Sequence, residues 1–148
     1  MKQHTRRQYL SLMIAAAAAL SVTALPVRAD EPVKVVYHLS DGIDQASRAL
    51  ANIRNHLRAA PGTRIVVVGL GDGISFMLKE AHERNGKPFE PAIADLIRQG
   101  VEFRICMNTL AAHNVPVSQI ISTVQQVPSG VAEIARLQAR EGFAYLRP

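Results

Sequence analysis

The chain contains a single cysteine, Cys106, which directly follows a segment in which apolar and polar residues alternate, residues 101–105. Such alternation is typical of a half-buried strand. Asn108 and Thr109, two and three residues after Cys106, are predicted to be N-cap residues of a short helix. The thiol is therefore expected between a strand end and a helix N-terminus, where ligands and reactive groups gather in open α/β sheets. The helix dipole at such a position favours thiolate over thiol, which makes Cys106 the candidate nucleophile.

Arg104 precedes Cys106 by two residues, so strand alternation places both side chains on one face. Its guanidinium is predicted to support the thiolate if both groups lie near the surface. The alternative is an inert thiol, because free cysteines are among the most buried residues. A lone cysteine cannot form an internal disulfide, so Cys106 either fills space or reacts with an external partner.

A glycine-rich segment, with Gly69, Gly71 and Gly73, follows a nearly continuous apolar run at residues 64–69. Backbone amides in such a loop can cradle an anion. The segment lacks the lysine and hydroxyl residue of a phosphate-binding P-loop. The segment is therefore a candidate ligand loop, but the favoured interpretation is a tight turn beside Cys106.

The other titratable residues do not form a recognisable catalytic or metal-binding pattern. His38, His82 and His113 are scattered, and a metal site that joins His38 or His113 to Cys106 would require the fold to bring them together. The sequence has no Ser-His-Asp order and no conspicuous carboxylate pair. We expect neither a metal nor a cofactor.

Strand-like and helix-like segments alternate along the chain. Strands are predicted near residues 33–39, 64–69, 101–105, 123–127 and 143–146, and helices near 43–57, 74–84, 91–99, from 109 onward and from 130 to 142. Asp41 and Ser129 are expected to cap helices, and Gly142 to end the last one. This alternation predicts an α/β fold of three α/β/α layers with a mainly parallel sheet.

The first 29 residues are predicted to be an export signal. Lys2, Arg6 and Arg7 precede an alanine- and leucine-rich stretch at residues 10–25, and small residues at 27–29 suit cleavage after Ala29. The paired arginines also resemble a twin-arginine signal. An uncleaved membrane anchor is the alternative, but the stretch is short for a span of about 20 residues. We expect a periplasmic protein with one domain, residues 30–148.

The net charge of +5 arises largely in this predicted signal. Residues 1–29 hold four of the 17 basic residues and none of the 12 acidic ones, which leaves 13 against 12, or +1, for residues 30–148. No basic stripe with interleaved aromatics remains, so we do not expect nucleic acid as a partner. No second long apolar segment follows, so we expect no membrane association after signal removal.

Several segments resemble the DsrE/DsrF-like family with the YchN-like fold, in particular its small exported single-domain members. The resemblance is carried by residues 34–40, 49–55, 100–110, 127–133 and 137–145. It implies a five-stranded parallel sheet and assembly as homotrimers or homohexamers. Some members of the family carry sulfur as a persulfide on a cysteine at the end of the strand that matches residues 101–105, and Cys106 falls on that position.

The leading hypothesis is a periplasmic sulfur-handling protein in which Cys106 accepts and passes on a sulfane sulfur, without classical turnover. The backbone near Asn108 and Thr109 would stabilise the anion. The donor and the acceptor thiol are not identified by the sequence. The alternative is a non-catalytic ligand-binding or assembly module in which Cys106 is structural.

Overall fold

Five parallel strands form one sheet in the computed structural model, which describes residues 31–148; the predicted export signal lies outside them. The strands are β1 (Lys34–Leu39), β2 (Arg64–Gly69), β3 (Glu102–Cys106), β4 (Gln125–Val127) and β5 (Ala144–Leu146). Their order across the sheet is β4-β3-β2-β1-β5. All four pairings are parallel, so the carboxyl ends of the strands share one edge.

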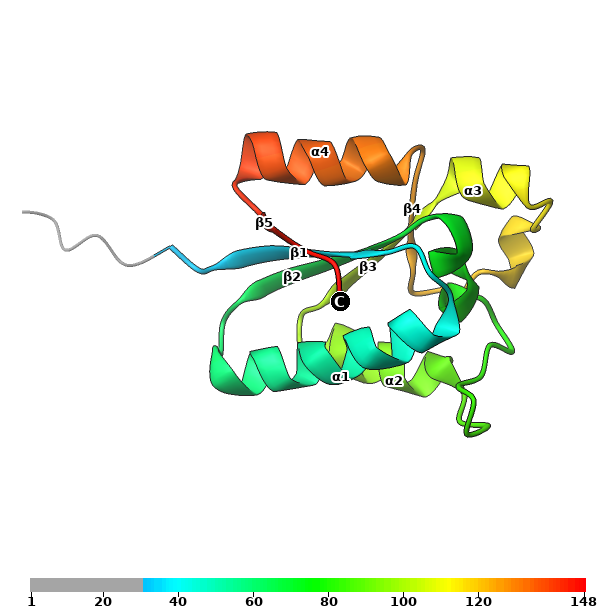
Figure 1. Cartoon of the computed structure of the whole chain (residues 1–148), viewed down its shortest axis with the longest axis horizontal. Helices are drawn as coiled ribbons and strands as arrows, with labels where there is room; N and C mark the ends of the chain where they lie inside the picture. The colour runs from blue at the N-terminus through cyan, green and yellow to red at the C-terminus, as the bar shows by residue number, and fades with distance from the viewer. Residues whose placement is uncertain (1–30) are drawn as a thin grey trace, which may run out of the picture. The chain divides into compact units, whose positions relative to one another are not determined.

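Helices cover both faces of this sheet, which confirms the predicted three-layer α/β/α architecture (Figure 1). The α-helices are α1 (Ile43–Ala59), α2 (Phe89–Arg98), α3 (Met107–Ala112) and α4 (Gly130–Glu141). The chain also forms two 3-10 helices, η1 (Gly71–Met77) and η2 (Val117–Gln119). None of the helices described is both long and apolar enough to span a bilayer.

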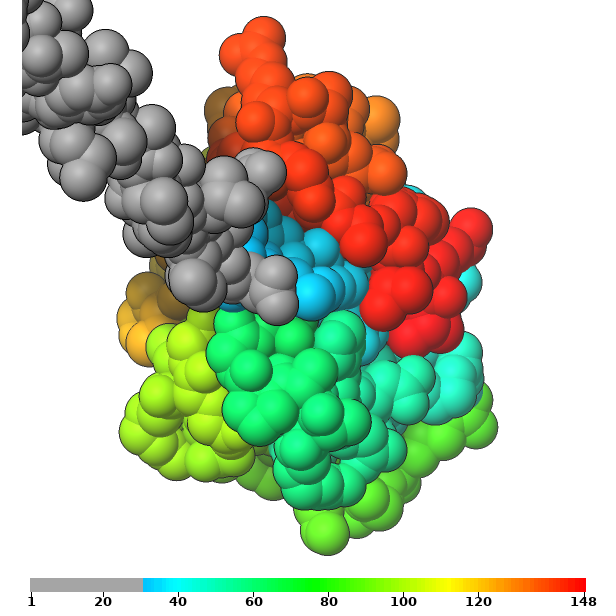
Figure 2. Space-filling view, turned by 90° about the vertical axis from the view of Figure 1, so that its left-hand side faces the viewer, coloured from blue at the N-terminus to red at the C-terminus, as the bar shows by residue number. Residues whose placement is uncertain are grey.

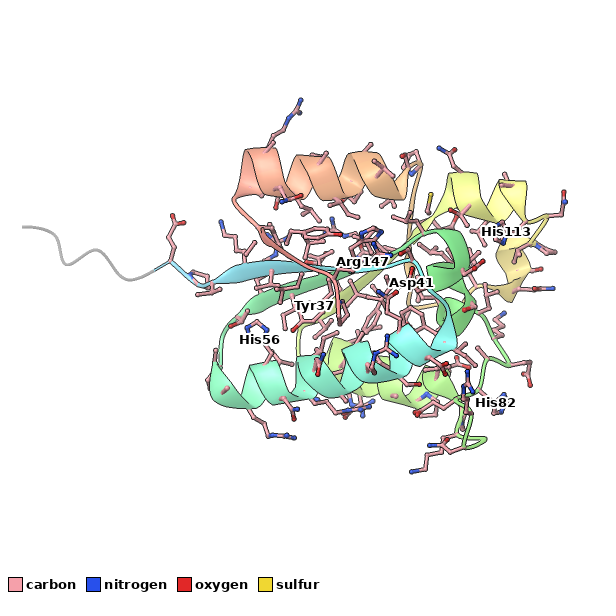
Figure 3. All side chains as sticks on the ribbon, viewed as in Figure 1. Tyr37, Asp41, His56, His82, His113 and Arg147 are labelled. Carbon is pink, nitrogen blue, oxygen red and sulfur yellow. The ribbon has the colours of Figure 1, made fainter. Side chains whose placement is uncertain are left out.

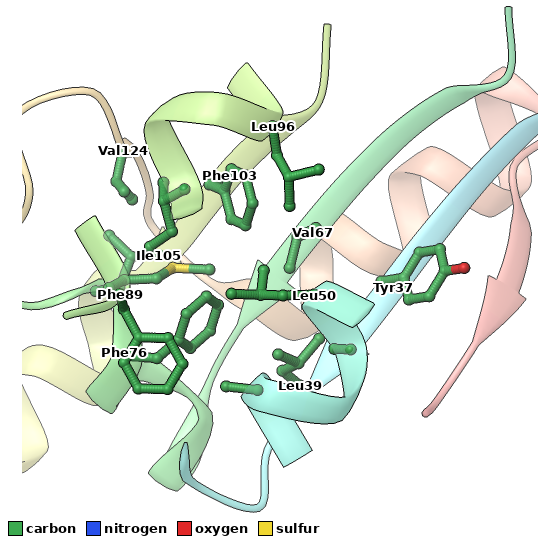
Figure 4. Close-up of a cluster of buried hydrophobic side chains, with 14 of the residues drawn as sticks. Tyr37, Leu39, Leu50, Val67, Phe76, Phe89, Leu96, Phe103, Ile105 and Val124 are labelled. Carbon is green, nitrogen blue, oxygen red and sulfur yellow. The ribbon is translucent and has the colours of Figure 1, made fainter. Parts of the chain in front are cut away.

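The larger hydrophobic core lies between the sheet and helices α1 and α2. Side chains from β1, β2 and β3 meet those helices and η1 there, and the rings of Phe76, Phe89 and Phe103 are among them (Figure 4). Phe76 packs edge-on against both other rings, at centroid distances of 5.7 and 6.2 Å. Aromatic pairs favour this geometry, and it adds to the free energy from apolar burial. The packing in this core stabilises the edge of the sheet at which the candidate site lies.

The smaller core lies on the opposite face, under α4. Two helix residues, Ile134 and Leu137, pack there against valines of β1 and β2 and against Phe143. Strand β3 adds no apolar side chain to this cluster, because alternation points Glu102, Arg104 and Cys106 to this face.

The prediction of an α-helix over residues 74–84 is wrong. The chain forms the 3-10 helix η1 and then leaves helical geometry, because its backbone pairs with a distant segment. Leu78 and Ile120 form an antiparallel bridge, and the Lys79 N–H donates to the Gln119 carbonyl at 2.7 Å. These bonds replace the carbonyl partners that a continuing helix would supply.

Candidate functional site

Cys106 is the last residue of β3 and the N-cap residue of α3. The structure thus places the thiol at the strand end and helix start, on the carboxyl edge of the sheet. Its side chain is buried, with the residue only 5% exposed. The prediction that Asn108 and Thr109 cap the following helix is wrong, because the helix begins at Met107 and both residues lie in its first turn. Neither N–H group has a partner within α3, and the Asn108 N–H donates to the Pro128 carbonyl at 3.2 Å.

Hydrogen-bond donors from two helices converge on the sulfur. Burial raises the pKa of the Cys106 thiol, but the Thr109 hydroxyl and the backbone N–H groups of Gly130, Thr109 and Asn108 outweigh this effect. The pKa therefore lies below the ordinary value for a cysteine. Hydrogen bonds to the charged form stabilise it, and this mechanism acts here without a neighbouring cation.

The glycine loop fixes the orientation of the Thr109 hydroxyl. The Gly71 N–H donates to Thr109 Oγ1 at 3.1 Å, which leaves the hydroxyl proton for the sulfur. The Gly73 N–H donates to the Leu70 carbonyl at 3.0 Å. Since both amides have partners within the protein, the loop supports Thr109 and does not present these groups to an anion.

Close packing explains the glycine at position 73. A Cβ on Gly73 would lie 2.1 Å from the carbonyl oxygen of Leu39, at the end of β1. Gly71 has a φ of +53°, in the left-handed region. The loop is therefore a tight turn against the end of β1, as its glycines predict.

Gly130, at the start of α4, is the site residue that sequence reasoning missed. A Cβ on it would lie 3.2 Å from Cys106 Cβ and 3.0 Å from Leu70 Cδ2, so glycine permits this close approach. Ser129 is the N-cap residue, as predicted, and its Oγ accepts from the Ala132 N–H at 3.3 Å. The Pro128-Ser129-Gly130 sequence after a strand signalled the helix start, but no local pattern revealed its contact with Cys106.

Arg104 shares the face of Cys106, as strand alternation predicts, but it does not support the thiolate directly. Its side chain is only 9% exposed and pairs with Glu102 and Glu133. It is not among the groups that lower the Cys106 pKa. The guanidinium charge is therefore compensated by two carboxylates.

The four histidines within the described residues lie on separate elements of the fold. His56, His82 and His113 occupy α1, a loop and the end of α3 (Figure 3). His38 contacts Tyr145, with Nδ1 2.7 Å from the phenol oxygen. Within residues 31–148, no three His, Cys, Asp or Glu side chains are grouped so that they could hold a metal ion.

Asp41 does not cap α1, contrary to prediction. The N-cap residue is Gly42, and the Asp41 carboxylate instead accepts from Arg147 Nη2 at 2.8 Å (Figure 3). Hydrogen bonds from Ser40 and Arg147 lower the pKa of the Asp41 carboxyl. This pair fastens the C-terminal segment beside β1, where the segment lies on the surface next to α1 (Figure 2).

A shallow hollow of about 440 Å³ lies between α1 and the C-terminal segment. Tyr37, His56 and Arg147 line it, and the Tyr37 hydroxyl is 3.0 Å from His56 Nδ1. None of the site residues predicted from sequence lines this hollow. The Cys106 site is thus separate from it.

The sequence matches one protein family over almost its whole length. The sequence profile of the DsrE/DsrF-like family matches residues 2–148. The chain belongs to the DsrE/DsrF-like family. Membership of this DsrE-like family suggests a sulfur-related function.

Two solved structures share the DsrE-like fold of this chain. The protein MTH1491 of unknown function from Methanobacterium thermoautotrophicum is 31% identical, with 78% of this chain and 99% of that chain covered and a TM-score of 0.69. The YchN protein from E. coli is 14% identical, with 80% and 99% covered and a TM-score of 0.57, which shows the common fold. A search of curated proteins gave no match.

Proposed function

We propose that Cys106 accepts a sulfane sulfur as a persulfide and passes it to an acceptor thiol. The observation that carries this proposal is the place of Cys106: a buried thiol at the end of β3, at the N-cap position of α3, against Gly130 at the start of α4. The Thr109 hydroxyl and nearby backbone N–H groups lower the pKa of this thiol, so a larger fraction of it is ionised at neutral pH than in an ordinary cysteine. Family membership, which suggests a sulfur-related function, supports the same chemistry.

The transfer requires no external oxidant. The Cys106 thiolate attacks the outer sulfur of a donor persulfide or polysulfide, so that a new S–S bond forms as the donor S–S bond breaks. The electron pair of the broken bond leaves with the donor thiolate, and Cys106 now carries the additional sulfur. An acceptor thiolate then attacks that outer sulfur, and Cys106 leaves as thiolate, stabilised again by Thr109 and Gly130.

A second candidate function is a ligand-binding or assembly module in which Cys106 is structural. Burial of the thiol, with the residue 5% exposed, favours this alternative. The two functions differ in the reaction of the native protein with a small thiol reagent. A sulfur acceptor reacts in the folded state, whereas a structural thiol reacts only after unfolding.

The proposal includes the periplasm as the compartment and a homotrimer or homohexamer as the assembly. The basic and apolar pattern of residues 1–29 supports export. Exposed apolar side chains support association, among them Tyr145 and Leu146 on β5, at 41% and 42%. N-terminal sequencing of protein from the periplasmic fraction is expected to begin at Asp30, whereas an intact Met1 in the membrane fraction contradicts export with cleavage.

Mass spectrometry of the protein after incubation with polysulfide tests sulfur loading. The folded protein of residues 30–148 is expected to gain the mass of one sulfur atom at Cys106, and a reductant is expected to remove it. Cys106→Ser serves as the control, because it should lose the adduct and keep the fold. If the native protein gains no sulfur and its thiol reacts only after unfolding, Cys106 is a structural residue.

A further inference from the structure

Six charged side chains join β2, β3 and α4 in a closed circuit of ion pairs, which we call the charge ring. Acidic and basic members alternate around it, in the order Arg64, Glu102, Arg104, Glu133, Arg136 and Glu141, with Glu141 returning to Arg64. The Arg64–Glu102 contact is 3.2 Å, the Arg136–Glu133 contact 2.8 Å and the Arg64–Glu141 contact 3.3 Å. Three positive and three negative charges compensate one another.

The pair formed by Arg104 and Glu133 is the most buried part of the ring. Their side chains are 9% and 11% exposed, whereas the other four lie between 29% and 42%. Exposed ion pairs contribute little to stability, but a buried charge left without its partner is strongly unfavourable. The Arg104–Glu133 contact therefore resists separation of β3 from α4 more than the other contacts do.

This pair runs alongside the contact between Cys106 and Gly130. Arg104 lies two residues before Cys106 on β3, about 6.6 Å along the strand. Glu133 lies three residues after Gly130 on α4, about 4.5 Å along the helix. The chain just before α4 is held by the pairing of Val127 with Cys106 and by the bond from the Asn108 N–H to the Pro128 carbonyl at 3.2 Å. The ion pair adds a contact between β3 and the helix itself, one turn after Gly130.

Apolar packing does not secure α4 over β3. The buried apolar residues of the helix, Ile134 and Leu137, pack with valines of β1 and β2. On this face β3 presents Glu102, Arg104 and Cys106 instead. Without the ion pair, the helix is free to tilt from its anchored start at Pro128, which moves the N–H of Gly130 relative to the sulfur.

We propose that Arg104 and Glu133 are positioning residues that hold the first turn of α4, and with it the Gly130 N–H, against the sulfur of Cys106. The inference deepens the proposed function, on which its biological role rests. The groups that face the ion pair are Glu102 on β3 and Arg136 on α4, and Arg64 reaches Glu102 from β2.

In Glu133→Ala, positioning and simple electrostatics predict opposite changes in the thiol pKa of Cys106. Loss of a nearby negative charge should by itself favour the thiolate and lower the thiol pKa. Positioning predicts the reverse, because the Gly130 N–H withdraws from the sulfur and the pKa rises. The measurement is the pH dependence of the rate at which the single cysteine reacts with a small alkylating reagent. We expect the rate at neutral pH, divided by its plateau at high pH, to be roughly three- to tenfold lower than in the wild type.

Two further variants separate positioning from a general loss of stability. Glu141→Ala removes the same charge at the far end of α4, 11 residues from Gly130, and should leave the thiol rate within about twofold of wild type. Arg104→Met combined with Glu133→Leu replaces the buried pair with apolar contact and keeps the other members paired. This double variant should restore the rate.

The outcomes decide between the possibilities. An unchanged or higher ratio of the neutral-pH rate to its high-pH plateau in Glu133→Ala, or an equal loss in Glu141→Ala, overturns the positioning role. Failure of the double variant to recover the rate, with its fold intact by circular dichroism, also overturns it. Polysulfide loading is measured separately, so a rate effect in a protein that gains no sulfur supports positioning while the sulfur-acceptor function fails.

Discussion

The backbone N–H of Gly71 donates to the Thr109 hydroxyl oxygen at 3.1 Å, and this bond joins the ends of two neighbouring strands. Gly71 begins the turn after β2, and Thr109 lies in the first turn of the helix after β3. Because the hydroxyl oxygen accepts from Gly71, its proton is directed to the Cys106 sulfur. The glycine-rich turn thereby orients a hydroxyl that lowers the pKa of a thiol 35 residues further along the chain than Gly71.

Thr109→Val removes this hydroxyl and retains the shape of the side chain. The thiol pKa of Cys106 should rise, because the thiolate loses a donor. A net hydrogen bond of about 1 kcal/mol corresponds to a roughly fivefold slower alkylation rate at neutral pH. Thr109→Ser keeps the hydroxyl and is the matched control. A Val variant that reacts as fast as the Ser variant would show that the hydroxyl does not stabilise the thiolate.

The lowered Cys106 pKa also predicts how stability depends on pH. Because the folded pKa lies below the unfolded one, the thiolate stabilises the fold fully above about pH 9, and this contribution is lost as pH falls through the folded pKa. The free energy of unfolding of the wild type, minus that of Cys106→Ser, should therefore increase with pH over this range. Urea titrations under reducing conditions measure it. A difference that stays flat or decreases with pH contradicts the direction of the shift.

Gly73→Ala should destabilise the protein by about 3 kcal/mol or more, because the added Cβ would lie 2.1 Å from the backbone oxygen of Leu39 and neither backbone can yield easily. Gly62→Ala is the control: it meets no atom within 4 Å and carries only the strain of a φ of +86°. That strain costs about 1 kcal/mol. Urea unfolding compares the two variants, and equal losses would rule out the clash as the cause.

Association through the β5 edge is expected for residues 30–148. Leu146→Lys should lower the mass measured by light scattering toward that of a monomer, because a charge on an exposed edge strand opposes pairing and apolar burial. Val33→Lys changes another exposed apolar residue, 60% exposed and outside the strands, and should keep the wild-type mass. A wild-type protein that is monomeric at all concentrations refutes the assembly.

Local patterns in the sequence determined the order and type of most elements. Apolar runs, alternation and turn residues predicted the five strands, α1, α2 and α4, and also the Ser129 cap and the closing Gly142. They placed Cys106 at a strand end before a helix. These features depend on residues within a few positions of one another, so a single sequence contains the information.

Only the tertiary structure decided which groups surround the sulfur. Gly130 is 24 residues from Cys106 in sequence, and Gly71 is 38 from Thr109, yet the parallel strand order brings all of them to one edge of the sheet. The same holds for Arg104, which pairs with Glu133 on α4 instead of supporting the thiolate. Long-range pairing also ended the helix predicted over residues 74–84, because backbone bonds to Gln119 and Ile121 replaced local helical bonds. These contacts depend on how the layers pack, so the spacing of residues along the chain does not predict them.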